Sequence, residues 1–421
     1  MTACMETSRR HLPIVIPLTG PTTALLAPRY PASSETFVYR DVRGLRRAGL
    51  DVVVVALRGN ADLIDDPDGP IQPAELVVYE GAGLAAAAAE LIARPWRSLL
   101  TLGRALADVI APGEPVAAAD RAKLPLQALY ALGLARRLRA RGVERLHAHF
   151  AHAPSTVGLY AAEHLGIPFS FTGHANDLFH RRSMLARKLR RAAFVACISE
   201  WHRELYASVA PAEEGRRPVV RCGVDTRAWA PRGDGADGGL LFVGRLVEKK
   251  GLDTLLRALA RPCASRLRLR VVGDGPMRDA WTALALETGV APRVEWLGAR
   301  GNADVRRELR RAEALVLPCR TDRAGDRDGI PVVLMEAMAC GVPVVAGDLP
   351  AIRELVEDGV TGRLVPGGDV EALARALAEL EADPEERERL ARAGRARVVA
   401  EFSMEANSAR LAKALREATS P

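Results

Sequence analysis

The sequence predicts an α/β protein with two domains, each built on a doubly wound parallel sheet. Its 421 residues exceed what one hydrophobic core usually organises. Short apolar runs alternate with amphipathic helical stretches over most of the chain, which is typical of parallel sheets covered by helices on both faces. Near the middle, residues 230–239 are rich in glycine and have no large apolar side chain, as expected for a linker.

The apolar runs are the predicted strands, and they divide into two sets. Before the glycine-rich segment they cover residues 23–27, 51–57, 145–150, 168–173 and 194–199. After it they cover residues 240–245, 267–273, 293–298, 314–319 and 342–347. We therefore expect a first domain over residues 1–229, a linker over 230–239 and a second domain over 240–400. The last residues, 401–421, are a predicted helix, and its return to the first domain is one hypothesis.

Composition excludes several classes of protein. With 48% hydrophobic and 26% charged residues the chain can build large cores, so general disorder is excluded. The six cysteines are scattered without a C-x-x-C pair, and this argues against a disulfide framework or a zinc site. No apolar run reaches the roughly eighteen residues that would span a bilayer. We expect a cytoplasmic protein, and a peripheral location at the inner face of the membrane is a further hypothesis.

The charge balance is basic, with a net charge of +7 that comes mainly from arginine. This excess has two explanations, a compositional habit of the source organism or attraction to phosphates and anionic lipid. We expect no nucleic-acid partner. Two segments bear on the lipid alternative. Residues 84–111 are alanine-rich and predict a helical hairpin that packs on the first domain, or that contacts a membrane or an acceptor lipid. Residues 181–191 are strongly basic and predict a solvated helix face, or a contact with anionic lipid headgroups or an acceptor's pyrophosphate.

A loop in the second half has the composition of an anion site. The predicted strand of LLFVGRLVEKKG, residues 240–251, ends at Val243, and Gly244 allows a tight exit from it. Arg245 and Lys250 follow in the loop before a helix. Two cations beside a helix N-terminus suit a diphosphate. A second strand runs into a glycine turn at residues 271–276, but it lacks the third glycine of a dinucleotide fingerprint, which argues against a nicotinamide enzyme.

The segment RDGIPVVLMEAMACG, residues 327–341, places one acid before an apolar helix and another inside it. Gly329 lets a ligand approach the backbone, and the free amides near Ile330 can receive a phosphate or sugar oxygen. Glu336 would be a costly buried charge without a partner. Sugar or ribose hydroxyls are suitable partners for it, and an internal arginine is the alternative.

These motifs resemble those of the retaining glycosyltransferases of family 4, and the resemblance spans roughly residues 22–415. The family carries G-R-L followed by lysine and glycine, matched by Gly244, Arg245 and Lys250. It also carries an acid, seven residues and a glutamate, matched by Asp328, where the family usually has glutamate, and Glu336. The resemblance implies the GT-B fold, in which two Rossmann-like domains face each other across a cleft.

The resemblance also implies roles for these residues. Gly244, Arg245, Lys250, Gly329 and Ile330 would bind the nucleotide diphosphate. Asp328 would contact the donor sugar's hydroxyls, and Glu336 would contact ribose or sugar oxygens.

Two segments of the first half resemble those of family members that build exopolysaccharides such as colanic acid. They begin SSETFVYRDVRG at residue 33 and HAHFAHAPSTVGLY at residue 147. The resemblance implies that His174 faces the donor sugar and that Asp177 is its near neighbour. It implies that Ser34 and Glu35 lie toward the acceptor.

The implied activity is transfer of a sugar, with retention, from a nucleoside diphosphate sugar such as a UDP- or GDP-sugar to a saccharide or lipid-linked saccharide. The process would be exopolysaccharide or cell-surface glycan synthesis. We expect no metal and no further cofactor, because the D-x-D strings at residues 66–68 and 326–328 are short and common. His147, His149 and His152 could suggest a metal cluster, and His147 and His149 share a face because they alternate on a strand. We favour structural or acceptor contacts for them instead. The alternative function is a non-catalytic sugar-nucleotide-binding partner subunit.

Overall fold

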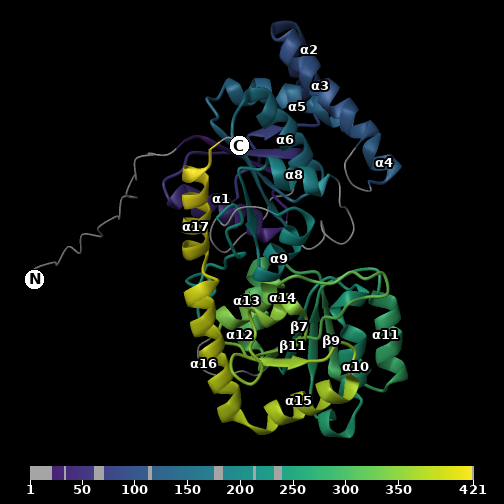
Figure 1. Cartoon of the computed structure of the whole chain (residues 1–421). Coiled ribbons are helices and arrows are strands. Elements are labelled where there is room, and N and C mark those ends of the chain that lie inside the picture. Colours follow the sequence, from purple (N-terminus) through teal and green to yellow (C-terminus); the bar gives the residue numbers. More distant parts are fainter. Residues whose placement is uncertain are drawn as a thin grey trace, which may run out of the picture.

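Two six-stranded parallel sheets organise the chain in the computed structural model (Figure 1). The structure describes residues 21–32, 35–60, 71–111, 116–174, 184–211, 215–231 and 239–419. The first sheet has the strand order β3-β2-β1-β4-β5-β6, and the second has the order β12-β11-β10-β7-β8-β9. The predicted α/β class with two parallel sheets is therefore confirmed.

The first lobe surrounds the first sheet. Its strands are β1 (Thr23–Tyr30), β2 (Val52–Gly59), β3 (Leu76–Val77), β4 (Arg145–His149), β5 (Phe169–Gly173) and β6 (Phe194–Cys197). One face packs under α5 (Leu124–Arg139) and α6 (Ala153–Leu165), and the other packs under α1 (Thr36–Arg47). Neighbouring residues of β1 point to opposite faces, so Leu26 belongs to the first of these cores and Leu25 to the second. Burial on both faces explains the continuous apolar runs.

The second lobe surrounds the second sheet and a single large core. Its strands are β7 (Leu240–Val243), β8 (Leu269–Val272), β9 (Val294–Gly298), β10 (Ala314–Leu317), β11 (Val344–Gly347) and β12 (Arg363–Val365). Its helices are α10 (Leu252–Leu259), α11 (Arg278–Glu287), α12 (Asn302–Arg311), α13 (Val332–Ala339), α14 (Pro350–Arg353), α15 (Val370–Ala382) and α16 (Pro384–Glu401). All ten predicted strands are present. Sequence reasoning missed β3 and β12, whose two and three residues are too short to show a period.

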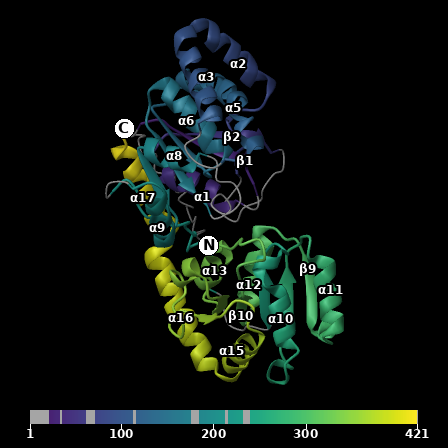
Figure 2. The same cartoon turned by 45° about the vertical axis from the view of Figure 1, so that its right-hand side comes forward.

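The C-terminal helix α17 (Met404–Glu417) lies against α1 of the first lobe in both views (Figures 1 and 2). Leu411 and Leu415 of α17 share a buried core with Leu45 of α1. The chain thus leaves the second lobe along α16 and ends on the first. The predicted linker, 230–239, falls largely on residues 232–238, which lie outside the described residues, so the domain limits stay a prediction.

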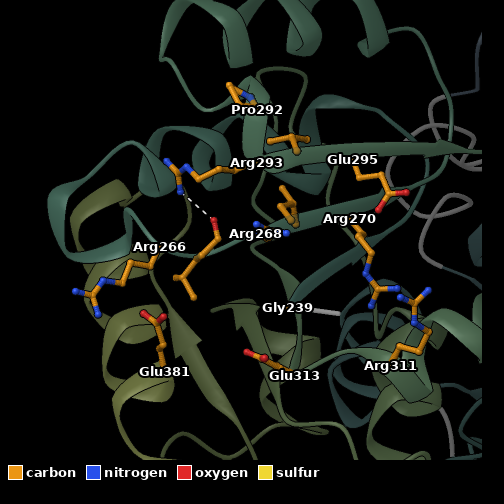
Figure 3. A pocket seen from close by; sticks show the side chains of 13 residues that line it. Gly239, Arg266, Arg268, Arg270, Pro292, Arg293, Glu295, Arg311, Glu313 and Glu381 are labelled. Atoms are coloured by element: carbon orange, nitrogen blue, oxygen red, sulfur yellow. Dashed lines mark hydrogen bonds between the residues drawn. The ribbon is translucent and has the colours of Figure 1, made fainter. Parts of the chain in front are cut away.

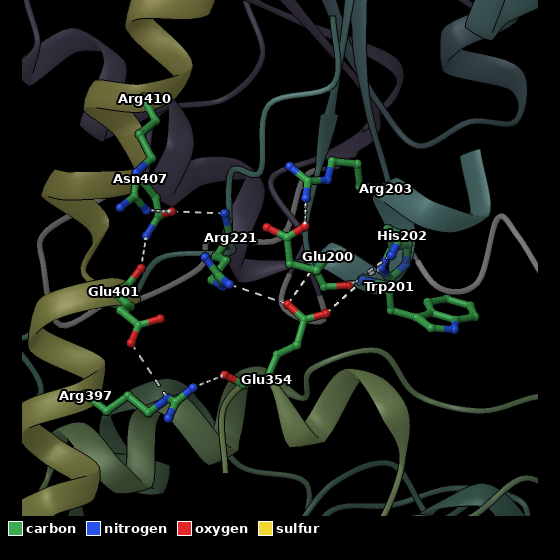
Figure 4. Close-up of polar contacts among 11 residues, drawn as sticks. Glu200, Trp201, His202, Arg203, Arg221, Glu354, Arg397, Glu401, Asn407 and Arg410 are labelled. Atoms are coloured by element: carbon green, nitrogen blue, oxygen red, sulfur yellow. Dashed lines mark hydrogen bonds and ion pairs between the residues drawn. The ribbon is translucent and has the colours of Figure 1, made fainter. Parts of the chain in front are cut away.

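The two lobes are also joined where α9 (Glu200–Val209) of the first meets α14 of the second (Figure 4). Glu354, which follows α14, accepts hydrogen bonds from the backbone amides of Glu200 and Trp201, each at 2.9 Å. A carboxylate at these amides satisfies donors that have no partner within the helix and interacts favourably with its dipole. The Arg221 guanidinium lies 3.5 Å from the same carboxylate. In the described part of the chain, no helix combines the length and apolar character that crossing a membrane requires.

Candidate active site

The candidate site lies at the carboxyl ends of the strands of the second sheet, where ligands bind in open α/β sheets. The loops after β7 and β8 touch here: a Cβ built on Gly273 would lie 1.9 Å from the carbonyl oxygen of Gly244. Gly273 also has φ +141°, a conformation that strongly favours glycine. Only glycine lets these two backbones approach so closely, and the sequence had singled out both turns.

Lys250 and Asp328 meet beside these turns. Lys250 follows β7 in a short 3₁₀ turn (Glu248–Lys250), and its Nζ lies 2.9 Å from Oδ2 of Asp328. Lys249 lies 2.8 Å from Asp326 and 3.5 Å from Asp328, so two ammonium groups face two carboxylates. The thiol of Cys319, after β10, donates to Asp328 at 3.2 Å. Two motifs that are remote in the sequence therefore form one charged cluster.

Within this cluster, the interaction between Lys250 and Asp328 keeps these two groups ionised. Burial would lower the pKa of the Lys250 amine, but Asp328 and its neighbours outweigh burial and raise that pKa above its ordinary value. Burial would likewise raise the pKa of Asp328, but Lys250 and Lys249 lower it. Arg245 differs from Lys250, because it is exposed and makes no ion pair with any described residue. The structure therefore places the two predicted phosphate-binding cations in different settings.

Gly329 and Ile330 lie in the turn directly before α13, with Gly329 buried. Within α13, Glu336 is 6% exposed and accepts a hydrogen bond at 2.7 Å from Arg40 of the first lobe. The structure thus provides the internal arginine that was the alternative to sugar hydroxyls, and the proposed ribose or sugar contact of Glu336 stays a prediction. Sequence reasoning assigned no role to Arg40, because no local pattern links residues on α1 and α13.

His174 follows β5 and lies in an aromatic cluster of the first lobe. Its ring centroid lies 4.2 Å from that of Phe37 and 4.7 Å from that of Phe150. Its Nε2 lies 3.3 Å from Nδ1 of His149. Burial holds the pKa of His174 well below its ordinary value and lowers that of His149 to about 3, so both rings are neutral near pH 7. Because Phe37 is one helical turn from Arg40 on α1, His174 lies on the side of the first lobe that meets α13.

Asp41 extends this cluster, and sequence reasoning missed it. Its Oδ2 lies 3.6 Å from Nε2 of His149, so Asp41, His149 and His174 form a chain of neighbours. Burial raises the pKa of Asp41 to about 7, although Arg40 opposes the shift. The only sequence signal was its place next to Arg40 in the segment that begins at residue 33.

The remaining predicted site residues lie either outside the described residues or in the first lobe. Ser34 and Asp177 lie outside the described residues, as does the D-x-D string at 66–68. Glu35 immediately precedes α1 and is half-buried. His147 contacts Ser170 at 2.8 Å and Thr172 at 2.9 Å, which occupies both ring nitrogens. Within the described ranges, no group of three or more His, Cys, Asp or Glu side chains could hold a metal ion.

A hollow of about 730 Å³ lies elsewhere on the second lobe (Figure 3). It borders Gly239, Leu269 and Val294, which stand at or before the amino ends of β7, β8 and β9. This is the edge of the sheet opposite Gly244 and Gly273. Of its arginines, Arg270 pairs with Glu308 and Arg293 donates to the carbonyl oxygens of three residues. The hollow is therefore separate from the candidate site, and we assign it no part in it.

The chain matches two family profiles. The profile "Glycosyltransferase Family 4" matches residues 34–228, and "Glycosyl transferases group 1" matches residues 233–397. The chain is 32% identical over 288 residues to a putative colanic acid biosynthesis glycosyltransferase, WcaL, of Salmonella typhimurium, covering 64% of this chain and 69% of that protein. It is 34% identical over 251 residues to a GDP-mannose-dependent alpha-(1-6)-phosphatidylinositol monomannoside mannosyltransferase of Mycolicibacterium smegmatis, covering 56% of this chain and 65% of that relative, slightly under two thirds.

Solved structures share the fold. Anabaena HepE in complex with UDP has a TM-score of 0.69 at 18% identity, covering 94% of this chain and 99% of HepE. Sucrose-phosphate synthase from Thermosynechococcus elongatus has a TM-score of 0.68 at 20% identity, covering 93% and 98%. At these identities the likeness concerns the fold alone. Together with the profiles and the relatives, these findings show that the chain belongs to glycosyltransferase family 4, a retaining family, and has the GT-B fold.

Proposed function

We propose that this protein transfers a glycosyl group from a nucleoside diphosphate sugar to a hydroxyl of a saccharide or lipid-linked saccharide, with retention of configuration. The observation that carries the proposal is the Lys250–Asp328 pair beside the touching turns of Gly244 and Gly273. An ammonium group at the carboxyl ends of a parallel sheet suits a diphosphate, and a carboxylate next to it suits sugar hydroxyls. The names of the relatives support both parts, since one uses GDP-mannose and HepE was solved with UDP-glucose.

The charged cluster suggests how the donor is accommodated. The formal charges of its two lysines and two aspartates cancel, and Asp328 holds the Lys250 ammonium group in place. The diphosphate of the donor would compete with Asp328 for Lys250. The carboxylate of Asp328 would then be free to accept hydrogen bonds from the hydroxyls of the donor sugar. Arg245, which is exposed and has no ion pair among the described residues, adds a second cation.

Catalysis would rest on stabilising charge in the leaving group. The transition state resembles an oxocarbenium ion, and negative charge grows on the departing phosphate. Lys250, Arg245 and the amides that open α13 would stabilise that charge. The neutral ring of His174 would orient the sugar by hydrogen bonding, and the departing phosphate oxygen would accept the proton of the acceptor hydroxyl. No side chain is needed as a covalent nucleophile.

We place this activity in exopolysaccharide or cell-surface glycan synthesis in the cytoplasm. The colanic acid relative supports the first part, and the phosphatidylinositol-derived acceptor in the other relative's name supports a lipid-linked acceptor. The five described cysteines are all free, which is consistent with a reducing compartment.

Thermal unfolding in the presence of UDP, GDP, ADP and their sugars tests the proposal. A ligand at about a hundred times its Kd should add roughly 2.7 kcal/mol of stability. Lys250→Met should remove most of this stabilisation. Arg266→Met is the matched control, because Arg266 is an exposed cation at the opposite edge of the same sheet and should not affect it.

Stabilisation by no nucleotide, or equal stabilisation of both variants, would refute the assignment. Slow release of nucleoside diphosphate from the bound donor, with no acceptor present, would identify an enzyme. Binding without release would favour the alternative, a non-catalytic partner subunit, for which the aspartate at position 328 is the supporting feature.

A further inference from the structure

The helices α2 (Gly81–Ala93) and α3 (Pro95–Ile110) form a hairpin on the outside of the first lobe, far from the second lobe (Figures 1 and 2). Three polar residues of α3 face inward. Ser98, Thr101 and Asp108 are each at most 3% exposed. Thr101 Oγ1 lies 3.0 Å from a ring nitrogen of His164, and Asp108 accepts a hydrogen bond from Tyr160 at 2.8 Å. The polar side chains on the inner side of α3 therefore have hydrogen-bond partners within the first lobe.

The outer side of α3 is apolar, which reverses the usual arrangement of a water-facing helix. Together with the end of α2 it presents six large side chains, which we call the hairpin face. They are Ile92 (83% exposed), Trp96 (79%), Leu99 (55%), Leu100 (63%), Leu106 (55%) and Ile110 (74%). At about 100° per residue, the five on α3 fall within an arc of roughly 120°, opposite Ser98, Thr101 and Asp108. Such a continuous stripe indicates a partner rather than scattered surface residues.

The exposed charges within residues 81–111 have one sign. The exposed ionisable side chains between residues 81 and 111 are Arg94, Arg97 and Arg104, whereas the two acids of this segment, Glu90 and Asp108, are buried. Arg104 and Arg191 both pair with the largely buried Glu163, at 3.4 Å and 2.9 Å, which places Arg191 of α8 (Leu185–Arg191) beside this flank of the hairpin.

We propose that the hairpin face docks on an anionic membrane surface, with its apolar side chains among the lipid tails and the flanking arginines at the headgroup phosphates. A helix with an apolar stripe, a positive flank and tryptophan near its end has the features of an interfacial helix that lies in the plane of the membrane. Two copies of the face would instead bring Arg94, Arg97 and Arg104 of one chain against those of the other, with no exposed acid of the hairpin to meet them. Charge therefore favours lipid over self-association.

The basic stretch at residues 181–191 contributes less exposed positive charge to the proposed membrane contact than its composition suggests. Residues 181–183 lie outside the described residues. Lys188 is fully buried, and its Nζ donates to the carbonyl oxygens of Ala151 and His152 at 2.7 and 3.0 Å. Arg187 pairs with Asp108. Arg190 and Arg191 remain exposed and extend the flank of the hairpin face.

Flotation with vesicles tests the proposal on the full chain. Wild type should bind vesicles of phosphatidylcholine with about one third phosphatidylglycerol, and bind phosphatidylcholine alone more weakly. Leu100→Glu should reduce binding at least tenfold, because it places a charge in the apolar stripe. Leu286→Glu is the matched control, because Leu286 is 67% exposed on α11 of the second lobe and should have no effect. Arg94→Gln should weaken binding to the anionic vesicles by about fivefold.

A second readout keeps the test independent of any single variant. Trp96 emission should shift to shorter wavelength with anionic vesicles, and the shift should vanish in Trp96→Phe. Equal unfolding temperatures and nucleotide responses of Leu100→Glu and wild type would separate this inference from the proposed function. Wild-type protein that binds neither vesicle, or Leu100→Glu that binds like wild type, would overturn the proposal. Sedimentation that finds a dimer broken by Leu100→Glu would also overturn it and identify the face as a self-interface.

Discussion

The ion pair between Arg40 and Glu336 makes a sharp prediction, because it joins the two lobes inside the protein. The two atoms lie 2.7 Å apart, and the side chains are 2% and 8% exposed. Arg40→Met removes the guanidinium but keeps an unbranched chain that can still pack near Trp229. It leaves the carboxylate of Glu336 buried without its partner.

The expected loss of stability follows from the balance between the attraction of the two charges and the free energy of removing them from water. With an effective dielectric constant near 20, charges 2.7 Å apart attract by about 6 kcal/mol, and desolvation offsets much of that gain. Losing one partner keeps the desolvation cost and removes the attraction. Arg40→Met and Glu336→Gln should therefore each lower the free energy of unfolding by about 3–5 kcal/mol. The double variant should cost less than the sum of the two by about 2 kcal/mol.

Urea unfolding, followed by circular dichroism and by tryptophan fluorescence, measures these changes. Coincidence of the two transitions is the condition for a single free energy of unfolding. Arg47→Met is the matched control on the same helix. The Arg47 side chain is 53% exposed and lies 3.3 Å from Asp225, so its loss should cost less than about 1 kcal/mol. If Arg40→Met falls within 1 kcal/mol of wild type, or the coupling is below about 0.5 kcal/mol, the pair does not hold the lobes together as described.

Three further predictions concern titration, backbone geometry and metal. Burial raises the pKa of Asp41 from its ordinary value of 3.8 to about 7. Its contribution of about 4 kcal/mol to stability is therefore fully present below pH 3.8 and is lost as pH rises through 7. The lowered pKa of His149 makes its own contribution to stability change with pH in the opposite direction. The difference in unfolding free energy between Asp41→Asn and wild type therefore isolates the contribution of Asp41. From pH 4 to pH 7 the variant should become progressively more stable relative to wild type. If the unfolding free energies of the two proteins instead change in parallel with pH, the raised pKa of Asp41 is contradicted. Gly273→Ala should destabilise by about 2 kcal/mol or more in urea, whereas Gly103→Ala, whose Cβ meets nothing within 4 Å, should stabilise slightly. Transfer should continue at an unchanged rate in chelator, and a loss that divalent cation restores would contradict the metal-independent mechanism.

Local patterns in the sequence were sufficient to predict ten of the twelve strands and their division between two sheets. Ten apolar runs became ten strands, because a strand buried on both faces needs nearly every residue to be apolar. The turns at Gly244 and Gly273 could also be recognised, since a glycine directly after a buried strand is a local signal. The short strands β3 and β12 gave no such signal, because pairing with β2 and β11, rather than their own composition, makes them strands.

The pairings that build the candidate site arise from the tertiary structure. Lys250 and Asp328 belong to separate motifs, and Arg40 and Glu336 belong to separate lobes, so no spacing along the chain predicts that they touch.

The hairpin of α2 and α3 shows the same difference between what the sequence predicts and what the tertiary structure determines. Its sequence indicates a helical hairpin, but only the packing of Thr101 and Asp108 against α6 reveals that these polar side chains of α3 are buried. Secondary structure follows from interactions within a few residues. Which side chains meet depends on how the elements cross, and that is determined by the whole chain at once.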